Sequence, residues 1–288
     1  MKTHRAVQAA TAVALGLTLA ACSSGDGDTH SSDAVTTVSH IHGLGLDPSD
    51  QRLYVATHEG IYTPGPKGNP ELVGDSKDDF MGFTVAQGKT FYASGHPASG
   101  ADGPGNKGLI KSTDAGRSWR SLSLSGKSDF HALDYAHGTV YGYDSTGGLL
   151  RTSKNGTTWK DRATLQALDI AVNPDDADLV LATTAEGVAR STDGGTTFDK
   201  GKQPVMAFLS WKAKNALYGI DTSGRLSRST DGGATWKKLA TVPGGQPQAL
   251  TAVDAQHVLA ATQSGVYESK DGGKTFTKRL AVEAGGGH

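Results

Sequence analysis

The octapeptide Ser112-Thr-Asp-Ala-Gly-Arg-Ser-Trp119 recurs along the 288-residue chain and decides its fold. Successive copies begin 40, 39, 38 and 40 residues apart, and the other four are Thr152–Trp159, Ser191–Phe198, Ser229–Trp236 and Ser269–Phe276. In each copy the Asp can accept backbone N–H bonds inside a tight turn, the Gly can adopt positive φ, and the aromatic residue can fill the core of a small sheet. The second copy has Lys154 at the Asp position, so we expect Asn155 to hold that turn. A constant period of this length predicts a repeat architecture.

Each copy follows two β-like runs and a Gly-apolar step, as in Gly108-Leu-Ile and Gly187-Val-Ala. An earlier unit has Gly60-Ile-Tyr at the same step, although its turn is eroded to Pro64-Gly-Pro-Lys-Gly68. The chain therefore holds six units of four short strands. We predict an all-β fold, a six-bladed β-propeller that spans residues 38–282 as one domain, with residues 283–288 as a flexible tail.

The repeated octapeptide resembles the Asp-box (BNR) motif of sialidase-like and sortilin-like β-propellers. Nearly the whole chain beyond the leader is also similar to bacterial lipoproteins labelled glycosyl-hydrolase-like or exo-sialidase-like, and the matching segments are His40–Gly45, Leu53–Tyr62, Asp79–Phe83 and Ser94–Pro97. The resemblance implies a glycosidase that acts on surface or extracellular glycans. However, the Arg-containing F/Y-R-I-P motif of sialidases is absent here, and a shared fold does not carry function. Sialidase activity itself is therefore not expected.

The N-terminus predicts a lipoprotein signal peptide over residues 1–21. Lys2 and Arg5 precede an apolar run from Ala6 to Leu19, which is too short to span a bilayer but fits the h-region of a secretory signal. The run ends in Leu19-Ala20-Ala21-Cys22, which resembles the lipobox of bacterial lipoproteins. That family implies cleavage before Cys22 and acylation of it, which would anchor the chain stably to a membrane. Residues 22–37 then read as a polar tether, so we expect an extracytoplasmic, membrane-anchored protein.

The composition excludes several classes of function. A single Cys rules out a disulfide framework and any Cys-based zinc or iron–sulfur site. A formal net charge of −1 argues against a nucleic-acid partner, which would need a basic face. The chain has only three Met residues, so the place of each is informative.

The first strand of each unit shares a pattern of one variable residue, one small residue and one apolar residue. The six copies begin at His42, Met81, His131, Gln166, Met206 and Gln248. Because innermost strands line the channel of a propeller, we expect these six side chains to form a ring near one mouth. Two imidazoles and two thioethers suit a soft ion, above all Cu(I), so the predicted metal ligands are His42, Met81, His131 and Met206. We expect the accessory or supporting groups on the same face to be His40, His58, His96, Gln166 and Gln248.

Three alternatives stay open at this stage. The ring residues can be structural, since Met fills packed strand positions and channel His residues bond to trapped water. A glycosidase needs two carboxylates across a cleft, for which Asp79 and Asp129 are the best pair and Glu59 is a looser candidate. A scaffold that grips an envelope protein or glycan is the third. We favour a non-catalytic propeller that binds a ligand, with copper as the most specific candidate.

Overall fold

The computed structural model describes residue 38 and residues 40–282. The predicted signal peptide, Cys22 with its tether, and the tail at residues 283–288 lie outside the described residues, so the lipid anchor and these boundaries stay predictions. Within the part of the chain that is described, no helix combines the length and the apolar character needed to cross a bilayer.

The first three sheets each contain four antiparallel strands that pair in sequence order. The first sheet is β1 (Ile41–Leu46), β2 (Leu53–Thr57), β3 (Gly60–Pro64) and β4 (Pro70–Leu72), with the short 3-10 turn η1 (Pro66–Gly68) before β4. The second is β5 (Asp79–Gln87), β6 (Thr90–His96), β7 (Leu109–Ser112) and β8 (Arg120–Ser123). The third is β9 (Phe130–Ala136), β10 (Thr139–Asp144), β11 (Leu149–Ser153) and β12 (Lys160–Thr164).

The last three sheets follow the same plan, except that the fourth has three named strands. It consists of β13 (Ile170–Val172), β14 (Val180–Thr184) and β15 (Gly187–Ser191), and a single bridge between Val188 and Lys202 stands at its outer edge. The fifth sheet is β16 (Phe208–Trp211), β17 (Leu217–Ile220), β18 (Arg225–Ser229) and β19 (Lys237–Thr241). The sixth is β20 (Pro247–Ala252), β21 (Val258–Thr262), β22 (Gly265–Ser269) and β23 (Thr277–Ala281).

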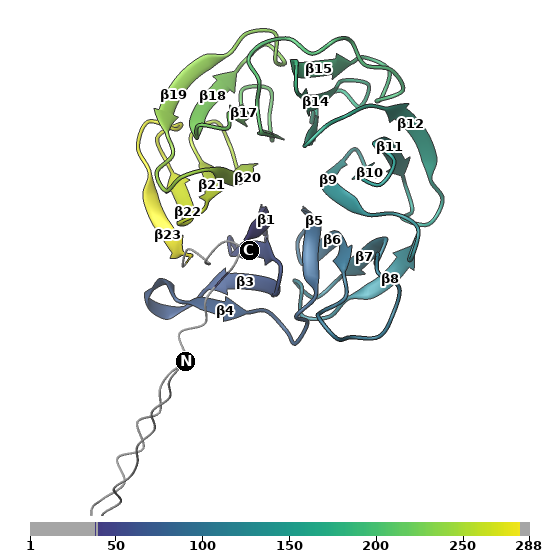
Figure 1. Ribbon diagram of the computed structural model, residues 1–288. Helices are drawn as coiled ribbons and strands as arrows, with labels where there is room; N and C mark the ends of the chain where they lie inside the picture. Colours follow the sequence, from purple (N-terminus) through teal and green to yellow (C-terminus); the bar gives the residue numbers. More distant parts are fainter. Residues whose placement is uncertain (1–37, 39, 283–288) are drawn as a thin grey trace, which may run out of the picture. The chain divides into compact units, whose positions relative to one another are not determined.

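The six sheets form blades around a central axis, with β1, β5, β9 and β20 nearest to it (Figure 1). The innermost strands contact one another in a closed ring, in the order β1, β5, β9, β13, β16, β20 and back to β1. Each blade is built from consecutive strands of the chain, and apolar clusters such as that of Val38, Ile41, Leu259 and Val266 join the last blade to the first. The predicted all-β, six-bladed propeller is therefore confirmed.

The repeated octapeptides form one kind of turn. In the first copy, Ser112 Oγ donates to Asp114 Oδ1 at 2.7 Å, and the N–H of Gly116 donates to Ser112 Oγ at 2.8 Å. In the second copy, Asn155 Oδ1 accepts the N–H groups of Thr157 and Thr158 at 2.9 and 2.8 Å. Asn155 thus replaces the missing Asp, as expected. Because these turns satisfy their own backbone donors, they join the two outer strands of a blade without help from its neighbours.

Side chains of the preceding blade bond to the innermost strands of five of the six blades. The channel-facing edge of an innermost strand would leave backbone groups unpaired, which is costly in a buried place. Polar side chains of neighbouring blades fill that role, in the pairs Phe130 N to Ser94 Oγ (3.1 Å), Val172 N to Asp134 Oδ2 (2.9 Å), Leu209 N to Asp169 Oδ2 (2.8 Å) and Ala252 N to Ser210 Oγ (2.9 Å). The ring closes in the same way, because the N–H of Ile41 donates to Gln248 Oε1 at 3.2 Å.

Candidate functional site

Four variable positions of the innermost strands lie at β-bulges. The pairing with the second strand skips one residue of the first strand, and the skipped residues are His42, Met81, His131 and Gln248. A bulge leaves its extra residue out of the ladder and redirects the side chain, and bulges gather at the rims of barrels and next to functional sites. Since each bulge lies near the start of its innermost strand, the four residues lie toward the same end of the channel.

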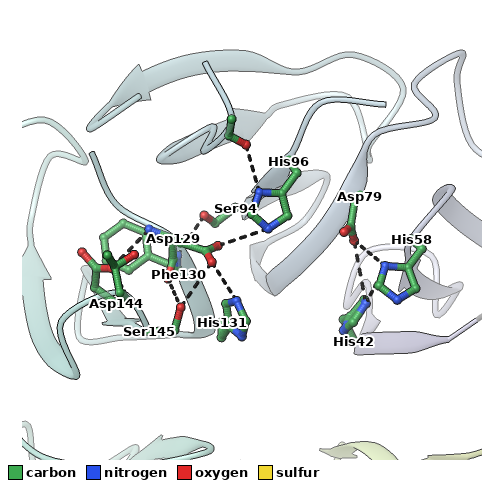
Figure 2. Close-up of polar contacts among 12 residues, drawn as sticks. His42, His58, Asp79, Ser94, His96, Asp129, Phe130, His131, Asp144 and Ser145 are labelled. Atoms are coloured by element: carbon green, nitrogen blue, oxygen red, sulfur yellow. Dashed lines mark hydrogen bonds and ion pairs between the residues drawn. The ribbon is translucent and has the colours of Figure 1, made fainter. Parts of the chain in front are cut away.

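His42, His58 and Asp79 form the first His/Asp cluster. His42 is in β1, His58 directly follows β2, and Asp79 begins β5 of the next blade. The Nε2 atom of His42 lies 3.3 Å from Nδ1 of His58. The Oδ1 atom of Asp79 lies 3.7 Å from His42 Nε2 and 3.1 Å from His58 Nδ1. Figure 2 shows the three side chains pointing toward one another, so two nitrogens and one oxygen converge.

Two of the potential ligand atoms of the first cluster, His42 Nε2 and His58 Nδ1, share a hydrogen bond. The Oδ1 atom of Asp79 is buried and accepts no hydrogen bond from the described residues. Burial, followed by the neighbouring imidazoles of His58 and His40, lowers the pKa of His42 to about 3. His42 is therefore neutral at physiological pH and keeps a nitrogen lone pair, which is the form that binds a metal ion.

His40 extends the first cluster, and Gln248 holds it in place. The His40 ring lies 4.8 Å from the His42 ring, centroid to centroid. The amide nitrogen of Gln248 is 3.1 Å from Nδ1 of His40, while its oxygen accepts the N–H of Ile41. Burial and the charge of His58 lower the pKa of His40. Gln248 thus supports His40 and closes the ring of blades, and both of its polar atoms are already engaged.

His96, Asp129 and His131 form the second His/Asp cluster, one blade further on. The Oδ2 atom of Asp129 is 2.8 Å from Nε2 of His131 and accepts a 3.2 Å hydrogen bond from Ser145 Oγ. The Oδ1 atom of Asp129 lies 3.8 Å from Nε2 of His96 (Figure 2). The hydrogen bond with Asp129 raises the pKa of His131. Burial alone would raise the pKa of Asp129, but the hydrogen bond and charge of His131 outweigh it and lower that pKa. In each of the two clusters, the potential ligand atoms all lie within 4.8 Å of one another.

Two predicted ring members do not reach the channel mouth. Met206 is 3% exposed and packs in the apolar cluster that includes Leu181 and Leu209. Gln166 precedes β13, and its segment is held against the third blade because Tyr143 Oη donates to Leu165 O and accepts the N–H of Ala167. Leu168 takes the ring position of the fourth blade instead: its N–H bonds Thr183 O in β14, and its side chain is 56% exposed. Met206 therefore packs in the interior, while His42, Met81 and His131 lie at the bulges.

Two further predicted residues lie near the two clusters along the chain. Met81 is partly exposed at its bulge in β5, two residues after Asp79. Glu59 is exposed in the turn between β2 and β3, where its backbone N–H bonds Thr57 Oγ1. The sequence prediction missed Ser145, which holds Asp129. The signal for it was its position directly after a second strand, the place that His58 occupies in the first blade.

No protein-family model matches this sequence, and no curated protein is significantly similar to it. Solved structures do share the fold. A GH74 enzyme from Niastella koreensis is 17% identical with a TM-score of 0.62, and the match covers 86% of this chain and 46% of the enzyme. YCF48 from Cyanidioschyzon merolae is 16% identical with a TM-score of 0.52, covering 86% and 88%. Virginiamycin B lyase from Staphylococcus aureus is 11% identical with a TM-score of 0.57, covering 85% and 87%.

These similarities define the class of this protein as a β-propeller. The chain spans less than half the length of two GH74 enzymes that it matches, 38% of one and 46% of the other. At such low identities the likeness shows the fold alone, because one fold serves many unrelated activities. The function must therefore be argued from the side chains at the channel mouth.

Proposed function

We propose that this protein is a lipid-anchored, extracytoplasmic β-propeller that binds a divalent transition-metal ion at one mouth of its channel. The ligands are His42, His58 and Asp79. The observation that carries the proposal is the buried Oδ1 atom of Asp79, which faces two imidazole nitrogens and has no hydrogen-bond partner among the described residues. A carboxylate oxygen removed from water is costly unless a donor or a cation compensates it, and a metal ion supplies that charge.

The spacing of the three donor atoms suits a single ion. Metal–ligand bonds of about 2.0–2.1 Å place two ligands about 3.3 Å apart in tetrahedral geometry. The three separations in the first His/Asp cluster are 3.1, 3.3 and 3.7 Å. Three protein ligands leave at least one position of the ion for water or a further ligand, which is the arrangement of catalytic and exchangeable sites.

The donor types favour a borderline ion over a soft one. Two imidazoles and a carboxylate suit Zn(II), Cu(II) or Fe(II), whereas Cu(I) prefers thiolate and thioether ligands. With Met206 in the interior, the case for Cu(I) weakens. Copper stays in the proposal as Cu(II), because it binds nitrogen and oxygen sites most tightly among the first-row divalent ions.

The anchor is proposed from the lipobox-like segment Leu19–Cys22 and from the resemblance to Asp-box lipoproteins. Membrane fractionation of bacteria that express the chain tests this part. The wild type should sediment with the membranes, and Cys22→Ser should release it. A wild-type protein found in the soluble fraction would contradict the anchor.

A glycosidase is the second candidate, supported by that resemblance and by the carboxylates Asp79 and Asp129. Such an enzyme needs one carboxyl protonated as the acid and one ionised as the base or nucleophile. The lowered pKa of Asp129 suits the ionised role. Turnover of a panel of aryl glycosides that disappears in Asp129→Asn would favour the enzyme over simple metal binding. The scaffold alternative predicts capture of an envelope protein; another propeller of this fold, YCF48, is described as bound to a D1 peptide.

The metal proposal is tested on the full chain, solubilised in detergent and purified without an oligohistidine tag. After removal of metals with a chelator, the protein is titrated separately with Zn²⁺ and Cu²⁺. We expect His58→Ala to weaken the site at least about tenfold, since even supporting residues of a metal site cost that much. His58 suits the test because its side chain is 46% exposed, so its loss leaves the core intact. Unchanged affinity in this variant would overturn the proposal.

His137→Asn is the matched control for that titration. His137 is also an exposed histidine, but its ring bonds Asn173 O and belongs to neither cluster. Its backbone φ of 51° lies in the left-handed region, which Asn tolerates. This variant should keep the affinity of the wild type.

A further inference from the structure

We propose that the second His/Asp cluster is a second cation site, built from His96, Asp129 and His131, which takes a divalent transition-metal ion of its own. The channel mouth then holds two ions in neighbouring blades. The inference uses the chemistry proposed for the first cluster, but its residues and contacts are separate.

The backbone partner of His96 determines which nitrogen of the neutral ring carries the hydrogen. Its Nδ1 lies 2.9 Å from the carbonyl oxygen of Gly105, in the loop between β6 and β7. A carbonyl oxygen can only accept, so Nδ1 carries the hydrogen and, in the neutral ring, Nε2 carries the lone pair. That lone pair faces Asp129 Oδ1 at 3.8 Å. This distance is too long for a hydrogen bond, so a protonated ring would not satisfy the oxygen either.

Asp129 is held so that one oxygen stays free. Its Oδ2 is engaged by His131 Nε2 and Ser145 Oγ. Its Oδ1 is buried without a hydrogen-bond partner among the described residues, in a residue that is only 9% exposed. A cation between them would compensate both the buried anionic oxygen and the nitrogen lone pair that faces it across the gap.

The gap has the size of an ion. Two metal–ligand bonds of about 2.0–2.1 Å span at most about 4.1 Å, so one ion bridges 3.8 Å at an open angle. In this structure His131 Nε2 donates a hydrogen to Asp129 Oδ2, so it becomes the third ligand when the ion displaces that proton. The potential ligand atoms of the cluster lie within 4.8 Å of one another. Ser145 acts as a supporting group that orients the carboxylate ligand.

The repeat architecture explains why two such sites stand side by side. In both clusters the loop-side His lies at the end of a second strand, as His58 does after β2 and His96 does at the end of β6. In both, the carboxylate comes from the start of the next blade, Asp79 at the start of β5 and Asp129 immediately before β9. Both carboxylates leave one buried oxygen unpartnered. The same His–Asp pair is thus repeated one blade further on, with its third ligand taken from a different strand.

The test measures how many ions each chain binds. The full chain in detergent, without a tag, is stripped, loaded with Zn²⁺ under mild excess, desalted and analysed by native mass spectrometry. We expect two Zn²⁺ per wild-type chain and one in His96→Ala. Asp79→Asn should also retain one, held by the second cluster. The double variant Asp79→Asn/His96→Ala should retain no Zn²⁺.

Two controls make the result decisive. Asp161→Asn, at an exposed carboxylate 3.3 Å from Arg151, should keep both ions. If His96→Ala does not fold, His96→Gln is the substitute, because it removes the nitrogen ligand at a partly exposed position. Circular dichroism checks that this variant is folded. Retention of every wild-type ion in His96→Ala overturns the second site. Loss of an ion in His96→Ala but not in Asp79→Asn leaves the second site standing and refutes the first.

Discussion

The Oδ1 atom of Asp79 lies 3.1 Å from Nδ1 of His58, and no hydrogen bond joins them. The two residues are on neighbouring blades, because His58 follows β2 and Asp79 begins β5. A buried carboxylate oxygen this close to an imidazole nitrogen is costly unless a positive charge joins them. That relationship is the basis of the first prediction.

Asp79→Asn should separate metal binding from folding. The amide keeps the shape of the side chain but removes the charge, so the affinity for Zn²⁺ should fall at least about tenfold. The metal-free variant should be no less stable than the metal-free wild type, because an uncompensated buried charge has been removed. Thermal denaturation with and without Zn²⁺ measures both effects. A variant that is destabilised without metal yet binds Zn²⁺ normally would show that Asp79 is structural.

Asp169→Asn should change how stability depends on pH. Burial raises the pKa of Asp169 to about 7, well above the ordinary value of 3.8. The folded state therefore binds a proton more tightly than the unfolded state. The contribution of protonated Asp169 to the free energy of unfolding is therefore fully present below about pH 4 and is lost as the pH rises through about 7. Asn can still accept the N–H of Leu209 and has no proton to lose.

The Tm of Asp169→Asn should therefore exceed that of the wild type at pH 8 by about 2–4 °C for each kcal/mol gained. At pH 4 the difference should vanish or reverse. Thermal denaturation at several values between pH 4 and pH 8 measures how the Tm of the wild type and of the variant depends on pH. Asp161→Asn, at an exposed position, is the control. Parallel curves for wild type and Asp169→Asn would mean that Asp169 is not protonated in the folded state near neutral pH.

Gly82→Ala should destabilise the ring of innermost strands. A Cβ at this position would collide with the backbone carbonyl oxygen of Phe130 in the next blade. Overpacking of this kind costs about 1–3 kcal/mol. Gly147→Ala is the control, since a Cβ there meets nothing within 4 Å. Urea denaturation of both variants compares the two costs, and equal stability would contradict the close approach of β5 and β9.

Asn155→Ala should cost more stability than Lys154→Ala. Asn155 accepts two backbone N–H groups, whereas Lys154 is exposed and makes no hydrogen bond through its side chain among those described. Losing these bonds should cost about 1–2 kcal/mol, while the Lys substitution should stay within about 0.5 kcal/mol. The free energies of unfolding of the two variants provide the comparison. A larger loss of stability in Lys154→Ala than in Asn155→Ala would contradict the role of Asn155 in this turn.

The repeats made the fold predictable, because a local turn with its own hydrogen bonds is visible in five copies of one octapeptide. The site was predictable only in part. His42, His58, Asp79, His96, Asp129 and His131 were all singled out from their positions at strand starts and ends. Their division into two clusters was not, since it depends on bulges and on which neighbour each carboxylate faces.

Met206 and Gln166 show why the shared strand pattern did not predict the ring correctly in two blades. Met206 occupies the expected place in the sequence, but its side chain packs among apolar residues of blades four and five. Gln166 lies two residues before Leu168, which takes the ring position of the fourth blade, because Tyr143 ties the segment of Gln166 to the third blade before β13 begins. Contacts between blades decided both cases, and a repeat pattern within one unit does not contain them.

Anomalous diffraction at the zinc edge tests the central claim most directly. Crystals of the wild-type protein grown with Zn²⁺ should show a peak about 2.0–2.1 Å from Nε2 of His42, Nδ1 of His58 and a carboxylate oxygen of Asp79. Data collected just below the edge should lose that peak. A map in which zinc lies only at surface sites elsewhere, with hydrogen-bonded water between these three side chains, would contradict the proposed metal function.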